Sequence, residues 1–155
     1  MTDAAPDTDR DPLALEHQVC FPLYAASRAL TAAYRPLLAP LGLTYPQYLV
    51  MLVLWERGTT PVGRLGTRLH LDSGTLSPLL KRLEAAGLIE RRRSTEDERV
   101  VHAALTSAGR ELRAAAQDVP RRIAETTGLD LETLTLLKRA CDALLTTTDD
   151  GGPTP

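Results

Sequence analysis

The chain has 155 residues, a formal net charge of −2, and only 4% aromatic residues within a hydrophobic fraction of 43%. This length fits one domain with a buried core, and the abundance of Ala and Leu favours helices over a sheet sandwich. The charge balance excludes a globally basic nucleic-acid binder, so such a function must rest on local charge. No apolar run approaches the ~20 residues that cross a bilayer.

Both ends of the chain are polar. Residues 1–11 and 148–155 are rich in Asp, Thr, Pro and Gly, and we expect them to be disordered tails. The acidic N-terminal segment has no apolar core, which excludes a signal peptide. Two cysteines make no disulfide scaffold. We therefore expect a cytoplasmic protein with reduced thiols and no membrane partner.

Four helices are predicted in the first part of the chain. The first covers residues 15–38 and is broken at Pro22, and the second covers 45–57. A short helix over 62–69 is followed, after three residues, by a helix over 73–86. The short connection between these last two helices is typical of a helix-turn-helix.

The helix over 73–86 begins with small hydrogen-bonding side chains and then becomes amphipathic. Ser73, Thr75 and Ser77 lie in its first turns, and Lys81 and Arg82 follow on the side opposite its leucines. Small polar residues at a helix N-terminus suit the reading of base edges in a major groove. Each such residue taken singly is also an ordinary helix cap.

A cationic hairpin is predicted next, with strands over 89–93 and 100–105 around an acidic turn. Between Arg64 and Arg93 seven basic residues face three acidic ones, a net charge of +4 in a chain of −2. A charge run by itself is usually a solvated face. A basic hairpin directly after a polar helix start instead predicts a localised DNA-binding surface, with a second contact to the backbone or minor groove.

Two further helices are expected, over 106–126 with a kink at Pro120 and over 130–146. Together with the first helix they carry more apolar surface than a small DNA-reading core can cover. We expect them to bury it against a second subunit, so that a two-fold dimer presents two recognition helices to adjacent major grooves. The fold class is therefore mainly α with a small β-hairpin wing: a winged helix-turn-helix with N- and C-terminal dimerisation helices.

The stretch L-K-R-L-E-A-A-G-L-I-E-R at 80–91, followed by D-E-R at 97–99, resembles the winged helix-turn-helix of MarR-family transcription regulators. The likeness extends over about 13–145. It implies a domain over 12–147, with a DNA-binding part over 45–105 and dimerisation helices over 13–38 and 106–147. It also implies that Asp97 braces Arg99 through an ion pair, with Arg99 in the minor groove. The predicted DNA-binding residues are Ser73, Thr75, Ser77, Lys81, Arg82, Arg91, Arg93 and Arg99.

The N-terminal segment is similar to the organic hydroperoxide regulators, the OhrR subgroup. The likeness rests on C-F-x-x-Y at 20–24, on Tyr34, and on T-Y-P-Q-Y at 44–48. It implies that Cys20 is a peroxide sensor, that Tyr34 and Tyr45 hydrogen-bond its sulfur across the dimer interface, and that Tyr24 lies close by.

The residues around Cys20 suit a sensor on chemical grounds. Pro22 disfavours helical geometry at Phe21 and suits a first helical position, which would put Cys20 just before a helix N-terminus. The positive end of the helix dipole favours a thiolate there, and tyrosine hydroxyls can donate to it. Pro22 departs from the subgroup's pattern and can shift the start of the helix. The alternative is a buried structural cysteine.

Cys141 lies on the apolar side of the last predicted helix, which indicates core packing. By the resemblance it is alternatively a resolving cysteine, because the subgroup includes members that form a disulfide between subunits. The three histidines are scattered without metal-ligand spacing. We expect no metal and no cofactor.

The predicted function is a homodimeric repressor that releases a pseudo-palindromic operator when an organic hydroperoxide oxidises Cys20. A low-molecular-weight thiol or Cys141 of the partner subunit would then cap the oxidised sulfur. Three alternatives stay open: a repressor released by a phenolic or other aromatic ligand, a thiol peroxidase, and a chromatin-like DNA binder. An enzyme is the less expected class, because the chain has no C-x-x-C and no basic residue evident beside Cys20.

Overall fold

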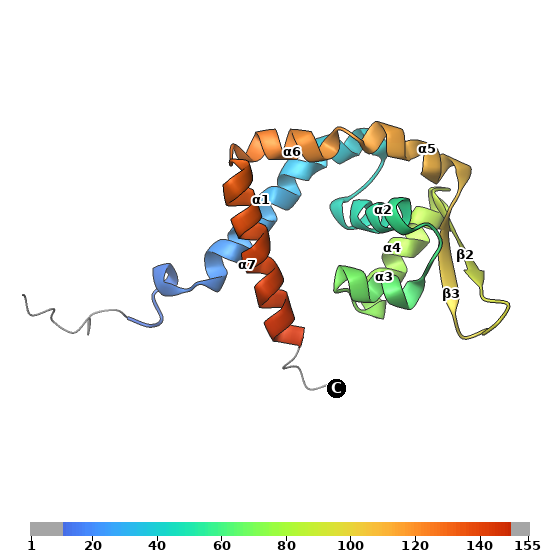
Figure 1. The fold of residues 1–155 in the computed structure, drawn as a ribbon, viewed down its shortest axis with the longest axis horizontal. Coiled ribbons are helices and arrows are strands. Elements are labelled where there is room, and N and C mark those ends of the chain that lie inside the picture. The colour runs from blue at the N-terminus through green and yellow to red at the C-terminus, as the bar shows by residue number, and fades with distance from the viewer. Residues whose placement is uncertain (1–10, 150–155) are drawn as a thin grey trace, which may run out of the picture. The chain divides into compact units, whose positions relative to one another are not determined.

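The computed structural model describes residues 11–149 and is mostly helical (Figure 1). In chain order its elements are η1 (Leu15–His17), α1 (Cys20–Leu38), η2 (Ala39–Leu41), α2 (Tyr45–Arg57), β1 (Thr60–Pro61), α3 (Val62–Leu69), α4 (Ser73–Ala85), β2 (Ile89–Arg93), β3 (Val101–Leu105), α5 (Ser107–Ala116), α6 (Val119–Thr127) and α7 (Leu131–Asp149). The predicted tails at 1–11 and 148–155 lie almost wholly outside the described residues; of them, Thr148 and Asp149 belong to α7. The chain divides into two compact units, Met1–Gln117 and Asp118–Pro155.

The core of the first unit lies where α2, α3 and α4 meet the small sheet. Its fully buried side chains are almost all aliphatic, and they include Met51, Leu54, Leu65, Leu80 and Ile89. Aliphatic residues recur at helical spacing on each of these helices, so each helix turns one apolar side inward. The predicted winged helix-turn-helix is confirmed, with α3 and α4 as its two helices.

The sheet has three antiparallel strands in the order β1-β3-β2. β2 and β3 form the predicted hairpin, in a register that pairs Ile89 with Leu105 and Arg93 with Val101. The strand β1, which was not predicted from the sequence, adds Thr60 and Pro61 to the other side of β3. Two residues that include a proline carry no alternating pattern, and a proline is tolerated here because β1 is an edge strand.

Two predicted helices are broken at places other than those expected. The first helix is interrupted before Cys20, between η1 and α1, whereas Pro22 lies inside the first turn of α1. The fifth is divided into α5 and α6, and Pro120 is the second residue of α6. The first turn of a helix has no internal use for backbone N–H groups, so proline fits there and need not mark the break.

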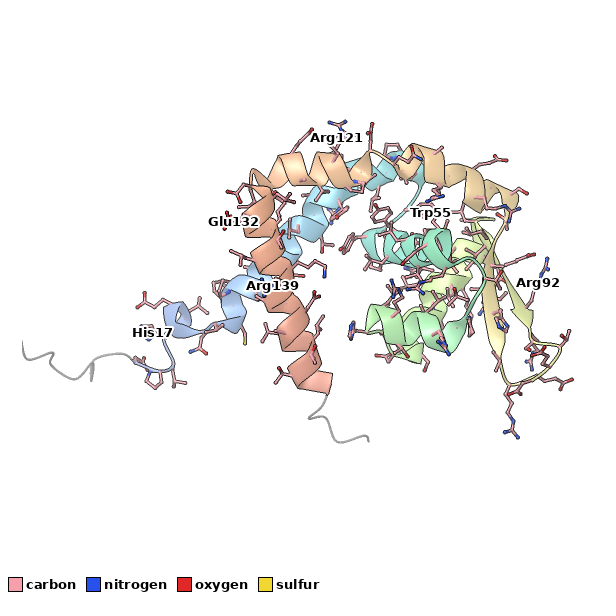
Figure 2. All side chains as sticks on the ribbon, in the orientation of Figure 1. His17, Trp55, Arg92, Arg121, Glu132 and Arg139 are labelled. Atoms are coloured by element: carbon pink, nitrogen blue, oxygen red, sulfur yellow. The ribbon has the colours of Figure 1, made fainter. Side chains whose placement is uncertain are left out.

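Close packing joins α5 to the turn that precedes the wing. The backbone N–H of Gly109 donates to the Thr106 hydroxyl at 3.1 Å, and that hydroxyl donates to the Gly87 carbonyl at 2.6 Å. The indole N–H of Trp55 extends from α2 to the Gly109 carbonyl at 2.8 Å (Figure 2). A Cβ at Gly109 would lie 2.0 Å from the Leu88 carbonyl oxygen. Only glycine allows this approach.

Long apolar surfaces stay exposed in a single chain. Of the 19 residues of α1 only Leu38 is buried, and Phe21, Leu23 and Tyr24 are exposed. In the second unit, α7 exposes a series of leucines: Leu131, Leu136, Leu137, Leu144 and Leu145. By length and composition no single helix within 11–149 could cross a membrane, although the bent pair Cys20–Leu41 and Tyr45–Arg57 meets those criteria jointly.

We expect Gly109→Ala to lower the free energy of unfolding by about 3 kcal/mol, because the added methyl group has no room beside the Leu88 carbonyl. Gly63→Ala is the matched control. Gly63 also lies in a helix but has open space around its Cβ position, so this change should raise stability by about 0.5 kcal/mol. Urea unfolding followed by circular dichroism measures both. Equal effects of the two substitutions would contradict the packing argument.

Candidate nucleic-acid interface and thiol site

The leucines of α4 determine which of its residues face outward. Leu76, Leu79, Leu80 and Leu83 are buried. The predicted contact residues of this helix are all exposed: Ser73, Thr75, Ser77, Lys81 and Arg82. Ser73, Ser77 and Lys81 follow one another at intervals of four residues and therefore form one line along the helix. The structure thus places Ser73, Ser77 and Lys81 on one accessible line, while Thr75 and Arg82 are exposed about half a turn around the helix from Ser73.

The start of α4 is held by a cap that the sequence analysis did not single out. The Asp72 carboxylate accepts a hydrogen bond from the backbone N–H of Thr75 at 2.8 Å. This bond lowers the pKa of Asp72, so the carboxylate is charged at neutral pH. An acidic cap is favourable at the positive end of the helix dipole. It was recognisable from the sequence as an Asp directly before the polar helix start.

The wing carries exposed cations on β2 and in the turn that follows. Arg92, Arg93 and Arg99 are exposed, and Arg92 points outward from β2 in Figure 2. The predicted ion pair between Asp97 and Arg99 takes another form. Within residues 11–149, the Asp97 carboxylate accepts from the backbone N–H of Arg99, at 3.0 Å, rather than from its guanidinium. Asp97 therefore braces the turn and leaves the Arg99 side chain free to reach outward.

Arg91 differs from its two neighbours on β2. Its guanidinium donates to Glu84 Oε2 through Nε at 3.1 Å and Nη2 at 2.7 Å. These hydrogen bonds are the largest cause of the lowered pKa of Glu84. The predicted DNA-contact residue Arg91 is thus occupied by a carboxylate of α4. Sequence spacing could not reveal this pair, because α4 and β2 meet only in the folded chain.

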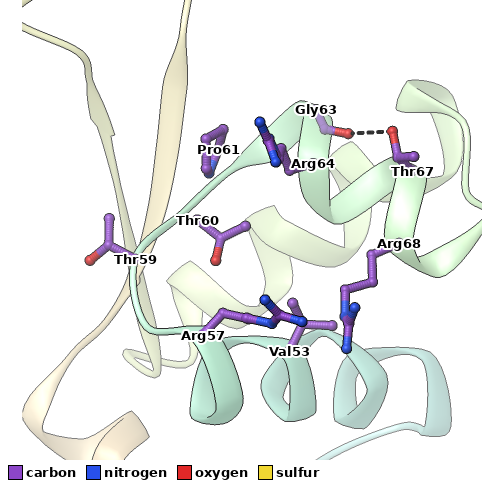
Figure 3. A pocket seen from close by; sticks show the side chains of 9 residues that line it. All are labelled: Val53, Arg57, Thr59, Thr60, Pro61, Gly63, Arg64, Thr67 and Arg68. Carbon is purple, nitrogen blue, oxygen red and sulfur yellow. Dashed lines mark hydrogen bonds between the residues drawn. The ribbon is translucent and has the colours of Figure 1, made fainter.

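A basic pocket lies between the end of α2, β1 and α3 (Figure 3). Arg57, Arg64 and Arg68 line it, and Glu56 pairs with Arg57 at 3.4 Å and with Arg68 at 2.8 Å. Arg64 has no ion-pair partner within the described range 11–149. Arg64 and Arg68 belong to the basic segment of the sequence, but neither has a predicted role there; their spacing of four residues on α3 was the available signal.

Cys20 is the first residue of α1, and its side chain is exposed. Tyr24 lies one turn further along and is also exposed, and the Arg28 guanidinium lies 5.6 Å from the centre of its ring. This distance is that of a cation–π contact. Tyr24 and Arg28 therefore follow Cys20 at about one and two turns along the same helix.

Tyr34 and Tyr45 form a separate cluster. Their ring centres lie 4.4 Å apart, and Tyr48 lies 5.9 Å from Tyr34. Burial, followed by the proximity of Tyr45 and Tyr48, raises the pKa of Tyr34 from 10.0 to about 12. Burial likewise raises the pKa of Tyr45. Both hydroxyls are protonated, and able to donate, throughout the physiological pH range, as those of unperturbed tyrosines also are.

The cluster does not meet Cys20 within one chain. Tyr34 follows Cys20 by fourteen residues on the same helix, which corresponds to roughly 21 Å at 1.5 Å per residue. The structure brings Tyr34 and Tyr45 together and places Tyr24 on the helix turn beside Cys20. The predicted hydrogen bonds to sulfur thus require a second chain.

Cys141 lies on α7 in the second unit and is half-buried. Both cysteines are free thiols. Among residues 11–149 no group of three or more His, Cys, Asp or Glu side chains is arranged to hold a metal ion.

Comparisons with known proteins are consistent with this geometry. Residues 32–115 match the family described as "Transcriptional regulator SarA/Rot". The organic hydroperoxide resistance transcriptional regulator of Bacillus subtilis (strain 168) is 50% identical over 137 residues, which are 88% of this chain and 93% of that protein.

Solved structures of regulators also match this chain. Reduced AbfR bound to DNA matches with a TM-score of 0.72 and 35% identity over 86% of this chain and 93% of that one. A disulfide form of AbfR, a protein of Staphylococcus epidermidis, matches with a TM-score of 0.57 and 35% identity over 88% and 90%. AbsC, a MarR family transcriptional regulator from Streptomyces coelicolor, matches with a TM-score of 0.77 and 26% identity over 92% and 100%.

The raised pKa of Tyr34 makes the free energy of unfolding depend on pH. A group that titrates at 10.0 when unfolded and about 12 when folded contributes stability that is complete below pH 10.0 and lost as the pH rises through about 12. We expect the free energy of unfolding of the wild type to fall across that window and that of Tyr34→Phe to fall less. Urea unfolding at a series of pH values measures this. Parallel curves for the two proteins would contradict it.

Proposed function

This chain belongs to the MarR family of transcriptional regulators, and we propose that it is a homodimeric repressor that binds operator DNA while Cys20 is reduced and releases it once Cys20 is oxidised by an organic hydroperoxide. The observation that carries the proposal is an exposed thiol at the start of α1 in a chain whose α4 and wing present hydrogen-bonding and cationic side chains. The 50% identical relative is named for organic hydroperoxide resistance. The same function places the protein in the cytoplasm with its DNA.

DNA contact is supported by the surface of the first unit. Ser73, Thr75 and Ser77 are short enough to let α4 lie deep in a major groove, while Lys81 and Arg82 reach phosphates or base edges. Arg93 and Arg99 on the wing would contact the backbone and the minor groove. Arg64 adds a cation on α3, the helix that in this motif crosses the backbone. AbfR, solved with DNA, shares this fold.

Dimerisation is supported by the apolar surface that one chain leaves uncovered. Phe21 and Leu23 on α1 are 44% and 42% exposed, and Leu131 on α7 is 80% exposed. Exposed apolar patches of this extent mark interaction sites. A second copy, related by a two-fold axis, would cover these helices and present the second α4 to the next major groove. It would also bring the Tyr34 and Tyr45 hydroxyls of one chain within reach of the other chain's Cys20.

The chemistry proposed for Cys20 consumes one peroxide. The Cys20 thiolate attacks the terminal peroxide oxygen, the O–O bond breaks, and sulfur becomes a sulfenic acid while the remaining alkoxide takes up a proton and leaves as the alcohol. A thiol, either a small free one or Cys141 of the partner subunit, then displaces water and forms a disulfide. Sulfur is oxidised in the first step and the hydroperoxide is reduced.

Oxidation changes both the charge and the size of the Cys20 side chain, at the place where two chains would meet. A neutral, larger group replaces a thiolate that the tyrosine hydroxyls would hold, and the rings at the interface must rearrange. Rotation of the two winged units out of register would weaken operator binding. The coupling needed is modest, since roughly 3 kcal/mol weakens binding on the order of 100-fold.

We expect cumene hydroperoxide to release wild-type protein from operator DNA and to leave Cys20→Ser bound. Cys141→Ser is the matched control, and it should still be released, because its Cys20 can be capped by a small thiol. Gel-shift assays with the reduced and oxidised proteins measure this, and intact-protein mass spectrometry shows whether a small thiol or the second cysteine has joined Cys20. Release of Cys20→Ser as readily as wild type would refute the sensor role. Release by a phenolic ligand without a mass change would support the alternative function.

We expect Lys81→Gln to weaken operator binding and to reduce the dependence of log affinity on log salt concentration by about one. The physical reason is that the exposed Lys81 would neutralise one phosphate and release its counterion. Lys138→Gln removes an exposed lysine of α7 that pairs with Asp142, and it should leave the salt dependence unchanged. Fluorescence anisotropy at several salt concentrations measures both. An unchanged slope for Lys81→Gln would remove Lys81 from the DNA contacts.

A further inference from the structure

A single carboxylate ties the wing to the recognition helix. Glu84, in the last turn of α4, accepts the two guanidinium hydrogen bonds of Arg91 described above. It also accepts the backbone N–H of Arg91, at 3.3 Å on Oε1. Both the main chain and the side chain of Arg91 on β2 are therefore bound to one side chain of α4. We call this arrangement the Glu84–Arg91 clasp.

The clasp spans a turn built around one glycine. Gly87 has a φ of +71° and open space around its Cβ position. The backbone N–H groups of Gly87 and Leu88 return to the carbonyls of Glu84 and Leu83, at 2.9 and 3.0 Å, and close the end of α4. The clasp adds a side-chain connection beyond that turn, on the edge strand of the sheet. An outward-facing N–H of an edge strand would otherwise be left to water.

Arg91 is unlike the two arginines that follow it. Arg92 pairs with Glu90 of its own strand at 2.6 Å, and Arg93 donates to the Glu98 carbonyl at 3.5 Å. The side chain of Arg91 is only 29% exposed, against 74% for Arg92. Two guanidinium N–H groups on one carboxylate oxygen, with the backbone N–H on the other oxygen, fix orientation as well as distance. Of these three arginines, Arg91 is thus the one placed to hold β2 at a set angle to α4.

We infer that Glu84 and Arg91 are positioning residues for operator binding: the clasp holds the wing at the angle to α4 at which Arg99 and Lys81 engage the same DNA duplex together. The inference rests on the proposed function and deepens it. It assigns Arg91 a role inside the protein, in place of the direct DNA contact that the sequence suggested. It also assigns a role to Glu84, an acidic residue on a helix that would approach polyanionic DNA.

Whether Glu84→Gln strengthens or weakens operator binding distinguishes a purely electrostatic role of Glu84 from a positioning role. If Glu84 acted on DNA only through its charge, Glu84→Gln would remove a repulsion and strengthen binding. Loss of the clasp predicts the opposite, because a wing at the wrong angle loses its contacts while α4 is engaged. The two possible roles of Arg91, as a DNA contact and as a positioning residue, also predict different results. If Arg91 contacted a phosphate directly, its removal would weaken binding to every DNA sequence and reduce the salt slope by about one. If Arg91 only positions the wing, its removal weakens binding to the operator selectively.

The test compares reduced full-length wild type, Glu84→Gln, Arg91→Gln, the double variant and Arg91→Lys. Fluorescence anisotropy measures binding to operator and to scrambled duplex at several salt concentrations, and thermal unfolding followed by circular dichroism shows that each variant is folded. We expect each single change, Arg91→Lys included, to weaken operator binding about tenfold. We also expect scrambled-DNA binding to stay that of wild type, and the double variant to be no weaker than either single one.

Several results would overturn the inference. These are operator binding by Glu84→Gln as tight as that of wild type or tighter, binding to scrambled DNA weakened as much as binding to operator in Arg91→Gln, or wild-type affinity in Arg91→Lys. If Glu84→Gln fails to fold, Arg91→Lys carries the decision, because it keeps the charge and loses the two-donor contact of the planar guanidinium. Failure of the proposed function would look different, since wild type itself would then show no preference for an operator or no response to peroxide.

Discussion

The burial of four leucines on α4 determines which side of that helix can meet another molecule. Leu76, Leu79, Leu80 and Leu83 pack against the core of the first unit, and this packing leaves the line from Ser73 to Lys81 on the outside. The cap at Asp72 fixes where the helix begins, and Gly87 fixes where it ends. The wing then follows at a short, defined distance, and the Glu84–Arg91 clasp sets its direction. Every proposed DNA contact on α4 and the wing depends on this one packed face.

Contacts within the first unit link the tyrosine cluster to the end of α4. Tyr34 of α1 lies against Tyr45 and Tyr48 of α2, and Tyr48 lies 6.3 Å from Trp55. Trp55 donates to Gly109 of α5, and the cap of α5 donates to Gly87. A rearrangement of the rings at a dimer interface would therefore act on a continuous series of packed groups. Such a series is a physical basis for coupling a change at Cys20 to the position of α4.

Two features of the single chain, its exposed apolar helices and the distance between Cys20 and Tyr34, are both explained by a second copy of the chain. Its α1 and α7 expose apolar side chains, and its Cys20 is about 21 Å along the helix from the tyrosine proposed to hold it. A second copy would address both at once. The hydroxyls of Tyr34 and Tyr45 are protonated at neutral pH, as in any tyrosine, and this is the form that donates to a thiolate.

Local patterns in the sequence were enough to predict the fold class, the family and most element positions. Apolar residues at helical spacing, a cap or a glycine at helix ends, and a three-residue connection are read along the chain, and they located α2, α3, α4 and the hairpin. The breaks before Cys20 and at Gln117 were misplaced, because proline marks a first turn as readily as an interruption. The strand β1 is too short to carry a pattern.

The partners of individual side chains were decided by tertiary structure. From sequence alone, Arg91 and Arg93 are both predicted DNA contacts, and the family resemblance makes Asp97 the partner of the Arg99 side chain. Folding brings Glu84 against Arg91 and turns Asp97 toward a backbone N–H. It also brings Tyr34 and Tyr45 together while leaving Cys20 apart from both. Sequence determined which chemical groups the chain carries and on which elements they lie. Which of those groups are satisfied internally, and which remain free to act, depends on contacts between segments distant in the chain, and no local pattern records them.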